Sequence, residues 1–95
     1  MITHVVLFRF HPEARAHLES ARAALASLGT RVPEVRSLSV GINVLASERA
    51  YDLGLIAEFD DLDALAAYRA HPVHKDVAHT VDRYCTSTVS VDYES

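Results

Sequence analysis

The uninterrupted apolar stretch at residues 2–10 constrains the fold more than any other feature of the sequence. It is rich in Val, Leu, Phe and Ile and contains no Gly or Pro, a pattern typical of a β-strand that is covered on both faces. Alternation gives one face Ile2, His4, Val6, Phe8 and Phe10 and the other face Thr3, Val5, Leu7 and Arg9. A sheet built around this strand therefore needs a covering layer on each side.

The rest of the chain divides into helices and strands joined by short connections. A helix is predicted from Pro12 to the stop signal at Gly29, and another from the capping pair Asp60 and Asp61 to Ala70. A third, short helix is predicted over 72–82, and strands over 35–44, 51–59 and 84–93. The 95 residues suffice for one modest core, so we expect a single domain over 1–95.

This order of elements, βαββαβ with a paired second helix, predicts a ferredoxin-like α+β fold. Right-handed crossovers then give a four-stranded antiparallel sheet that carries its helices on one face. The opposite face stays bare in a monomer, although Val5 and Leu7 of the first strand point to it. An exposed apolar face of this kind indicates a contact with a second copy, so we expect a homodimer.

Composition and charge exclude several classes of partner. Nine Lys and Arg stand against thirteen Asp and Glu, and the net charge of −4 comes with no basic cluster, which argues against nucleic acid. No apolar run approaches the roughly 20 residues of a membrane span. Cys85 is the only cysteine and has no partner for an internal disulfide or a metal site, which fits a reducing compartment. We expect a cytoplasmic protein without a membrane contact.

The stretch from Tyr68 to His79 gathers three histidines and a tyrosine around Pro72. Proline ends one helix and fits the first turn of the next, so His74 falls in a first turn. The positive end of the helix dipole disfavours an imidazolium there, and a neutral imidazole can accept a proton. Tyr68, from the last turn of the preceding helix, can reach the same place.

Two plainer interpretations of these polar residues stay open. In the structural one, His71 caps the helix break, His74 bonds locally, Tyr68 fills core, and His4 finds a backbone partner. In the metal-binding one, His71, His74 and His79 act as ligands, but Pro72 separates His71 from the helix of the other two and no acidic ligand converges. We therefore predict no metal site.

The sequence resembles the stress-responsive A/B barrel (Dabb) domain family over nearly its whole length. The resemblance rests on residues 4–10 (HVVLFRF), Gly41 and Asn43, residues 51–53 (YDL), residues 68–74 (YRAHPVH) and residues 91–93 (VDY). Members of this family are dimeric α+β barrels, so the resemblance implies the same fold and a homodimer here. Members of a plant polyketide cyclase branch, olivetolic acid cyclase among them, carry out acid–base chemistry between sheet and helices.

That branch works with groups that match His4, Tyr68 and His74. The resemblance implies that His74 removes a proton alpha to a carbonyl, that Tyr68 bonds the developing enolate, and that His4 positions the polar end of the substrate. The implied cyclase, lyase or isomerase chemistry needs no cofactor, and its ligand is a small apolar carbonyl or phenolic compound. Further substrate contacts are expected from His71, Val6, Phe8, Val77 and Ala78.

One departure from the cyclases lies in the first helix. Cyclase members line the cavity there with aromatic residues, whereas this sequence has Arg22-Ala23-Ala24-Leu25-Ala26. The cyclase substrate therefore does not transfer, and Arg22 is a candidate to meet a carboxylate or a plain surface residue. A ligand-binding protein without turnover and a structural, stress-associated dimer remain alternatives to an enzyme.

Overall fold

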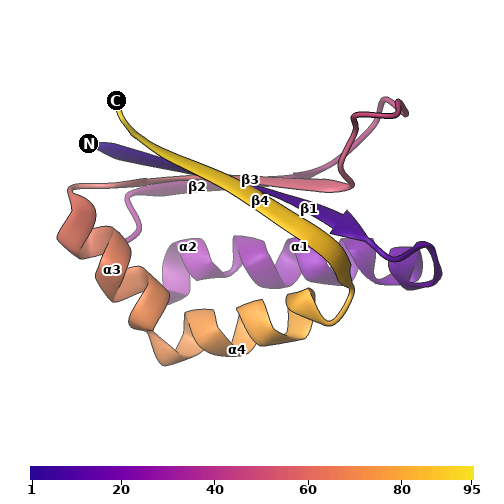
Figure 1. Ribbon diagram of the computed structural model, residues 1–95. Helices are drawn as coiled ribbons and strands as arrows, with labels where there is room; N and C mark the ends of the chain where they lie inside the picture. Colours follow the sequence, from indigo (N-terminus) through magenta and orange to yellow (C-terminus); the bar gives the residue numbers. More distant parts are fainter.

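The structure has two layers, a four-stranded antiparallel sheet and a layer of helices that covers one of its faces (Figure 1). This computed structural model describes residues 1–95. Its elements are β1 (Ile2–Phe10), the 3-10 helix η1 (Pro12–His17), α1 (Leu18–Ala26), α2 (Leu28–Arg31), β2 (Ser37–Ile42), β3 (Leu53–Phe59), α3 (Leu62–Ala70), α4 (Pro72–Asp82) and β4 (Cys85–Glu94). The predicted ferredoxin-like α+β fold is confirmed.

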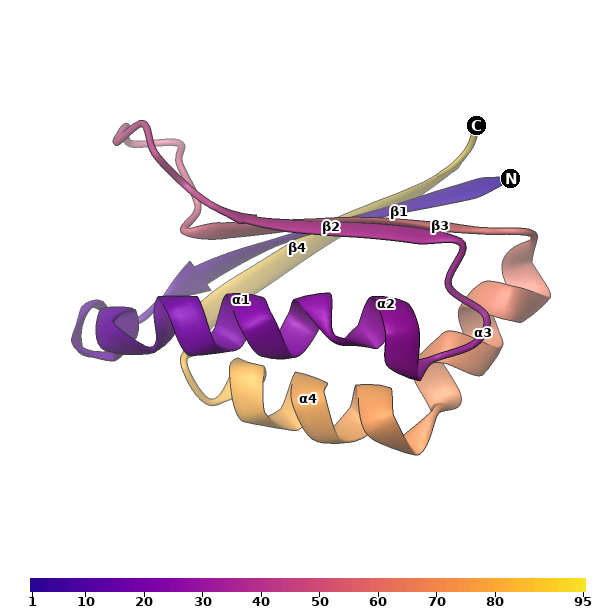
Figure 2. The ribbon, with the colours of Figure 1, turned by 180° about the vertical axis from the view of Figure 1, so that it is seen from behind.

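Strand β1 lies inside the sheet, whose order is β2-β3-β1-β4. It pairs antiparallel with β3 and with β4, and this register sets His4 between Ala57 on one side and Asp92 on the other. Helices α1 and α2 pack against β2, whereas α4 lies against the other helices and further from the sheet (Figure 2). No helix has the length and apolarity that crossing a bilayer requires.

The first helical region differs from the prediction that Gly29 stops it. The chain forms η1 and α1, breaks at Ser27, and continues through Gly29 as α2 to Arg31. Gly29 does not take the left-handed conformation of a glycine that ends a helix. The prediction that the helix ends at Gly29 is therefore wrong. The second and third strands are also shorter than predicted. Residues 35 and 36 precede β2, and residues 43–52 leave the sheet as a loop on the side away from the helices (Figure 1).

The core fills the space between the sheet and the helices. Its most deeply buried large side chains are Tyr68, Phe59 and Leu28, which are at most 1% exposed. These residues belong to α3, β3 and α2 and form part of one core cluster. The cluster therefore connects the sheet to two different helices. Of these three buried side chains, only that of Tyr68 carries a polar group, its hydroxyl.

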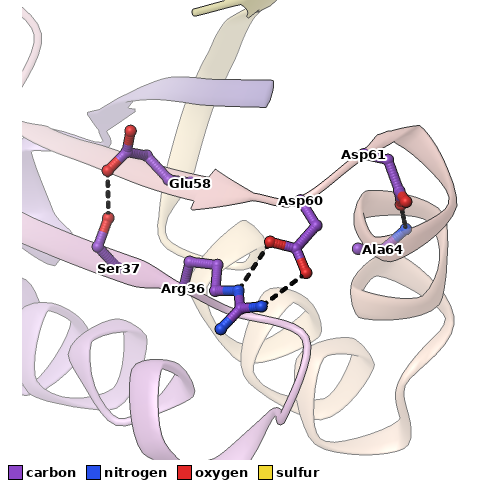
Figure 3. A network of polar contacts seen from close by, with 6 residues as sticks. All are labelled: Arg36, Ser37, Glu58, Asp60, Asp61 and Ala64. Atoms are coloured by element: carbon purple, nitrogen blue, oxygen red, sulfur yellow. Dashed lines mark hydrogen bonds and ion pairs between the residues drawn. The ribbon is translucent and has the colours of Figure 1, made fainter. Parts of the chain in front are cut away.

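Polar contacts surround the β3–α3 corner (Figure 3). The Asp61 side chain accepts a hydrogen bond from the Ala64 backbone N–H at 2.8 Å and so caps α3. Arg36 donates two hydrogen bonds to the Asp60 carboxylate, with N–O distances of 2.7 and 2.9 Å, and Ser37 donates to Glu58. The predicted capping role of this acidic pair is confirmed for Asp61, and the corner sets the direction in which α3 carries Tyr68 toward the sheet.

The face of the sheet away from the helices is apolar and uncovered. Its exposed large side chains are Leu7, Ile56, Val89, Val91 and Tyr93, which are 39–55% exposed. Pairing sets Leu7 opposite Val89, and Val5 opposite both Ile56 and Val91, so these side chains form one continuous patch. Strand β1 thus carries apolar side chains on both faces, as its sequence predicts, but Val5 and Leu7 on the bare face are not buried within the chain.

Candidate active site

A cavity of about 350 Å³ lies between the sheet and the helices. It is bounded by residues of β1, β3 and β4 from the sheet and of α1, α3 and α4 from the helices. The apolar side chains that line it from the sheet and the helices are Val6, Phe8, Leu25, Leu55 and Ala78. Its polar side chains include Tyr68 and His74, which are six positions apart, and His4, which comes from the first strand.

His4 is buried on the helix-facing side of β1 and lines the cavity. Its Nδ1 bonds a carboxylate oxygen of Asp92, the residue opposite it on β4. The other carboxylate oxygen of Asp92 accepts a hydrogen bond from the Arg69 guanidinium at 3.2 Å. An aspartate thus bridges a strand histidine and a helix arginine at the polar side of the cavity.

Tyr68 lies in the last turn of α3, and its ring fits between the two cavity histidines. Ring centroids are 4.4 Å apart for Tyr68 and His74 and 6.2 Å apart for Tyr68 and His4. Only 1% of the residue is exposed, but its hydroxyl oxygen is not fully enclosed and makes no hydrogen bond within the protein. Burial raises the pKa of Tyr68 to about 12, so the hydroxyl keeps its proton and is a donor.

His74 lies in the first turn of α4, as the Pro72 break predicts. Its Nδ1 is 3.3 Å from the backbone carbonyl oxygen of Arg69. Burial lowers the pKa of His74, with a smaller opposing contribution from that hydrogen bond. The imidazole is therefore neutral near pH 7, and its Nε2 has no partner in the protein.

Comparison with known proteins identifies the fold family. The model of the Stress responsive A/B Barrel Domain (Dabb) matches residues 2–95. The chain belongs to this family. Among curated proteins, none matches the sequence significantly.

Several solved structures share the fold of this Dabb protein, and some of them are described as dimeric. One, from Bacteroides fragilis, is a dimeric ferredoxin-like protein of unknown function, with 27% identity, a TM-score of 0.87 and coverage of 99% of this chain and 95% of that one. A second, from Thermobifida fusca, is also dimeric and of unknown function, with 26% identity, a TM-score of 0.84 and coverage of 99% and 90%. The hydroxynitrile lyase of Passiflora edulis shares the fold at 14% identity, with a TM-score of 0.84 and coverage of 97% and 90%.

The structure brings together six of the eight predicted site residues. His4, Tyr68, His74, Val6, Phe8 and Ala78 line the cavity of this Dabb protein. His71 instead caps α4, because its Nδ1 accepts a hydrogen bond from the Val73 N–H at 3.1 Å. Val77 packs in the core.

Two other candidates from the sequence also lie elsewhere. Arg22 pairs with Glu19 on the exposed face of α1 and does not line the cavity, which leaves it the plain surface role. His71, His74 and His79 form no metal-binding cluster, and no other group of His, Cys, Asp or Glu does so.

Sequence reasoning misses seven residues of the cavity lining, Leu25 and Arg69 among them, and it also misses Asp92, which bonds His4. Leu25 reaches the cavity from α1, where the cyclases have aromatic residues, and Arg69 borders it from α3. Asp92 stands on the polar face of the last strand, but only the register between β1 and β4 sets it opposite His4. A residue pair that depends on register leaves no local signal in the sequence.

Proposed function

We propose that this Dabb protein binds a small apolar carbonyl or phenolic compound in the cavity and performs cofactor-free acid–base chemistry on it. The reaction class is that of a cyclase, lyase or isomerase that removes a proton alpha to a carbonyl. One observation carries the proposal: the Tyr68 ring lies between two imidazoles in the lining of the cavity, and its hydroxyl makes no hydrogen bond within the protein. Because no group of the protein uses this donor, it is available to an oxygen atom of a ligand in the cavity.

The charge states of the three polar groups suit this chemistry. Because its pKa is raised to about 12, Tyr68 stays protonated and donates a hydrogen bond to the oxygen of a developing enolate. A neutral imidazole accepts the proton that leaves carbon and later returns it, a contribution typically worth about 10²–10⁴-fold in rate. The apolar lining from Val6, Phe8 and Leu25 accommodates the rest of the ligand.

The Passiflora edulis enzyme supports the reaction class in a limited way. Its description as a hydroxynitrile lyase means that lyase chemistry occurs on this fold. At 14% identity the likeness concerns the fold, so its substrate is not carried over to this protein.

The first test is thermal melting against a panel of β-keto acids, phenols and thioester mimics. A ligand at 100 times its Kd stabilises by about 2.7 kcal/mol, which raises the Tm of a domain of this size by roughly 10 °C or more. We expect such a shift in the wild type and its loss in His74→Ala. His79→Ala is the matched control, because His79 lies on the same helix but does not line the cavity.

Two other outcomes separate the alternatives. A Tm shift without any chemical change in the compound, followed by NMR, would mean a ligand-binding protein rather than an enzyme. If no compound in the panel shifts either protein, the acid–base proposal fails and a structural, stress-associated dimer becomes the better interpretation.

We also propose that the protein forms a homodimer through the bare face of its sheet. The apolar patch around Leu7 and Val91 is continuous, and relatives of 25–27% identity are described as dimeric. Leu7→Asp should convert the dimer to a monomer in sedimentation velocity. Leu62→Asp is the control, because Leu62 is equally apolar and 65% exposed but lies on α3; the same loss with both variants would contradict the proposal.

The proposed compartment is the cytoplasm. The only cysteine, Cys85, has no partner for a disulfide and needs no oxidising environment. Cell fractionation with an antibody against the protein tests this, and recovery outside the cytoplasmic fraction would contradict it.

A further inference from the structure

We propose that Asp92 is a positioning residue that fixes the tautomer of His4, so that His4 rather than His74 is the proton acceptor of the cavity. This inference rests on the proposed acid–base function and deepens it. It reverses the roles that family resemblance implies for the two histidines.

The contact with Asp92 decides which nitrogen of His4 carries the proton. An ionised carboxylate only accepts hydrogen bonds, so His4 Nδ1 must be the protonated nitrogen in the pair it forms with Asp92. Nε2 of the neutral ring then keeps its lone pair. Because His4 lines the cavity and Nε2 has no partner in the protein, that lone pair is available to a ligand.

Packing prevents His4 from turning away from this arrangement. The residue is 6% exposed, and its ring contacts Phe59 and Tyr68 edge to face, with centroids 6.3 and 6.2 Å away. Arg69 holds the far oxygen of Asp92 at 3.2 Å. The aspartate is thereby held from β1 on one side and from α3 on the other.

His74 lacks this support. Its Nδ1 is bonded to a backbone carbonyl, which is neutral, and no carboxylate contacts its ring. When a proton reaches Nε2 of His4, the imidazolium forms directly beside a carboxylate, which stabilises it as the aspartate of a serine-protease triad does. Burial lowers the pKa of His74, which makes it the poorer acceptor and suits it to hold a ligand hydroxyl.

The reaction moves one proton from carbon to His4 and one electron pair from the C–H bond to the carbonyl oxygen. The bond between carbon and hydrogen alpha to the carbonyl breaks, and its proton bonds to Nε2 of His4. The electron pair moves onto the carbonyl oxygen, which becomes an enolate and accepts a hydrogen bond from Tyr68. Asp92 stays ionised beside the imidazolium, and Nε2 gives the proton back to the product.

The test is the tautomer of His4, read from its two ¹⁵N chemical shifts in the full-length protein. Spectra are taken near pH 9, well above the usual titration range of histidine at about 6.5, and the His4 signals are assigned by their loss in His4→Gln. In the wild type we expect a protonated Nδ1 and an unprotonated Nε2. In Asp92→Asn the two shifts should exchange.

Arg69 makes the expected exchange definite. A guanidinium only donates, so the amide of the variant should turn its oxygen to Arg69 and its NH₂ to His4 Nδ1, which must then accept. The neutral His4 ring then carries its proton on Nε2, so the nitrogen that faces the cavity can no longer accept a proton. Asp82→Asn is the matched control, because Asp82 also lines the cavity but makes no contact with His4.

Each outcome of this experiment decides the proposal. Exchange in Asp92→Asn and unchanged shifts in Asp82→Asn support it. A proton on Nε2 in the wild type, or unchanged shifts in a folded Asp92→Asn protein, overturns it. The experiment needs no ligand, so its failure is distinct from a failure of the proposed function, which the melting panel tests.

Discussion

Two aspartates hold the two ends of β1 in the same way but with different consequences. Asp92 accepts hydrogen bonds from His4 near the start of the strand and from Arg69. Asp52 accepts the Phe10 backbone N–H at its end, at 2.7 Å, and pairs with Arg15 at 2.9 Å. Each carboxylate thus joins one group of β1 to one arginine.

The difference between them lies in the group that β1 contributes. The pairing of β1 with β4 shifts register between Arg9 and Phe10, and Asp52 accepts the Phe10 N–H there. A backbone N–H has only one state, so this contact can serve only the fold. His4 has two tautomers and faces a cavity, so the same contact at Asp92 selects a chemical state. The aspartate–arginine pair therefore supports only the fold when it binds a backbone N–H, as at Asp52. It can affect the chemistry when it binds a histidine that lines a cavity, as at Asp92.

The largest expected effect separates the two aspartates by activity. For any panel compound that the wild type converts, Asp92→Asn should lower kcat by roughly 10²–10⁴-fold, because the cavity side of His4 no longer accepts a proton. KM should change little, since the lining of the cavity is intact. Steady-state kinetics check this, and Asp52→Asn should keep most of the wild-type kcat. Equal losses from both variants would remove the distinction between them.

The next effect separates them by stability. Asp52 has only 10% of its side chain exposed, so Asp52→Ala leaves the buried N–H of Phe10 without an acceptor. The expected cost is about 2 kcal/mol, or on the order of 10 °C in Tm. Asp92→Asn should lower Tm by far less, because its pair with Arg69 is partly exposed. Calorimetry at equal protein concentrations checks both, and a larger fall for Asp92→Asn would contradict the comparison.

The sequence predicts the fold better than it predicts this pair of aspartates. Local patterns carry the helix break at Pro72 and the two apolar faces of β1, so both are readable from spacing alone. Contacts between distant segments cannot be read from spacing. His4 and Asp92 are 88 positions apart, and they meet only because the register of β1 and β4 sets them opposite each other. At Gly29 the local pattern itself misleads. A glycine there predicts the end of a helix, but the chain continues through it as α2.

A cavity imidazole without an aspartate should show its own pH dependence. Burial lowers the pKa of His74, so below its ordinary value of 6.5 the unfolded chain binds a proton that the folded protein resists, and stability falls with falling pH. His74→Gln removes this contribution. The wild type should therefore lose more stability than the variant in urea unfolding between about pH 7 and pH 5. A larger loss in the variant would mean that the folded protein favours the imidazolium of His74.

The smallest effect is expected from a third carboxylate–arginine pair, Asp60 with Arg36. Its two hydrogen bonds are as short as those of Asp52, and they lower the pKa of Asp60. Yet both side chains are more than half exposed, so water and salt replace most of what the pair contributes. Asp60→Ala should change Tm by no more than the error of the measurement, at low and high salt alike. A fall as large as that of Asp52→Ala would mean that hydrogen-bond geometry, rather than burial, sets the worth of such pairs in this fold.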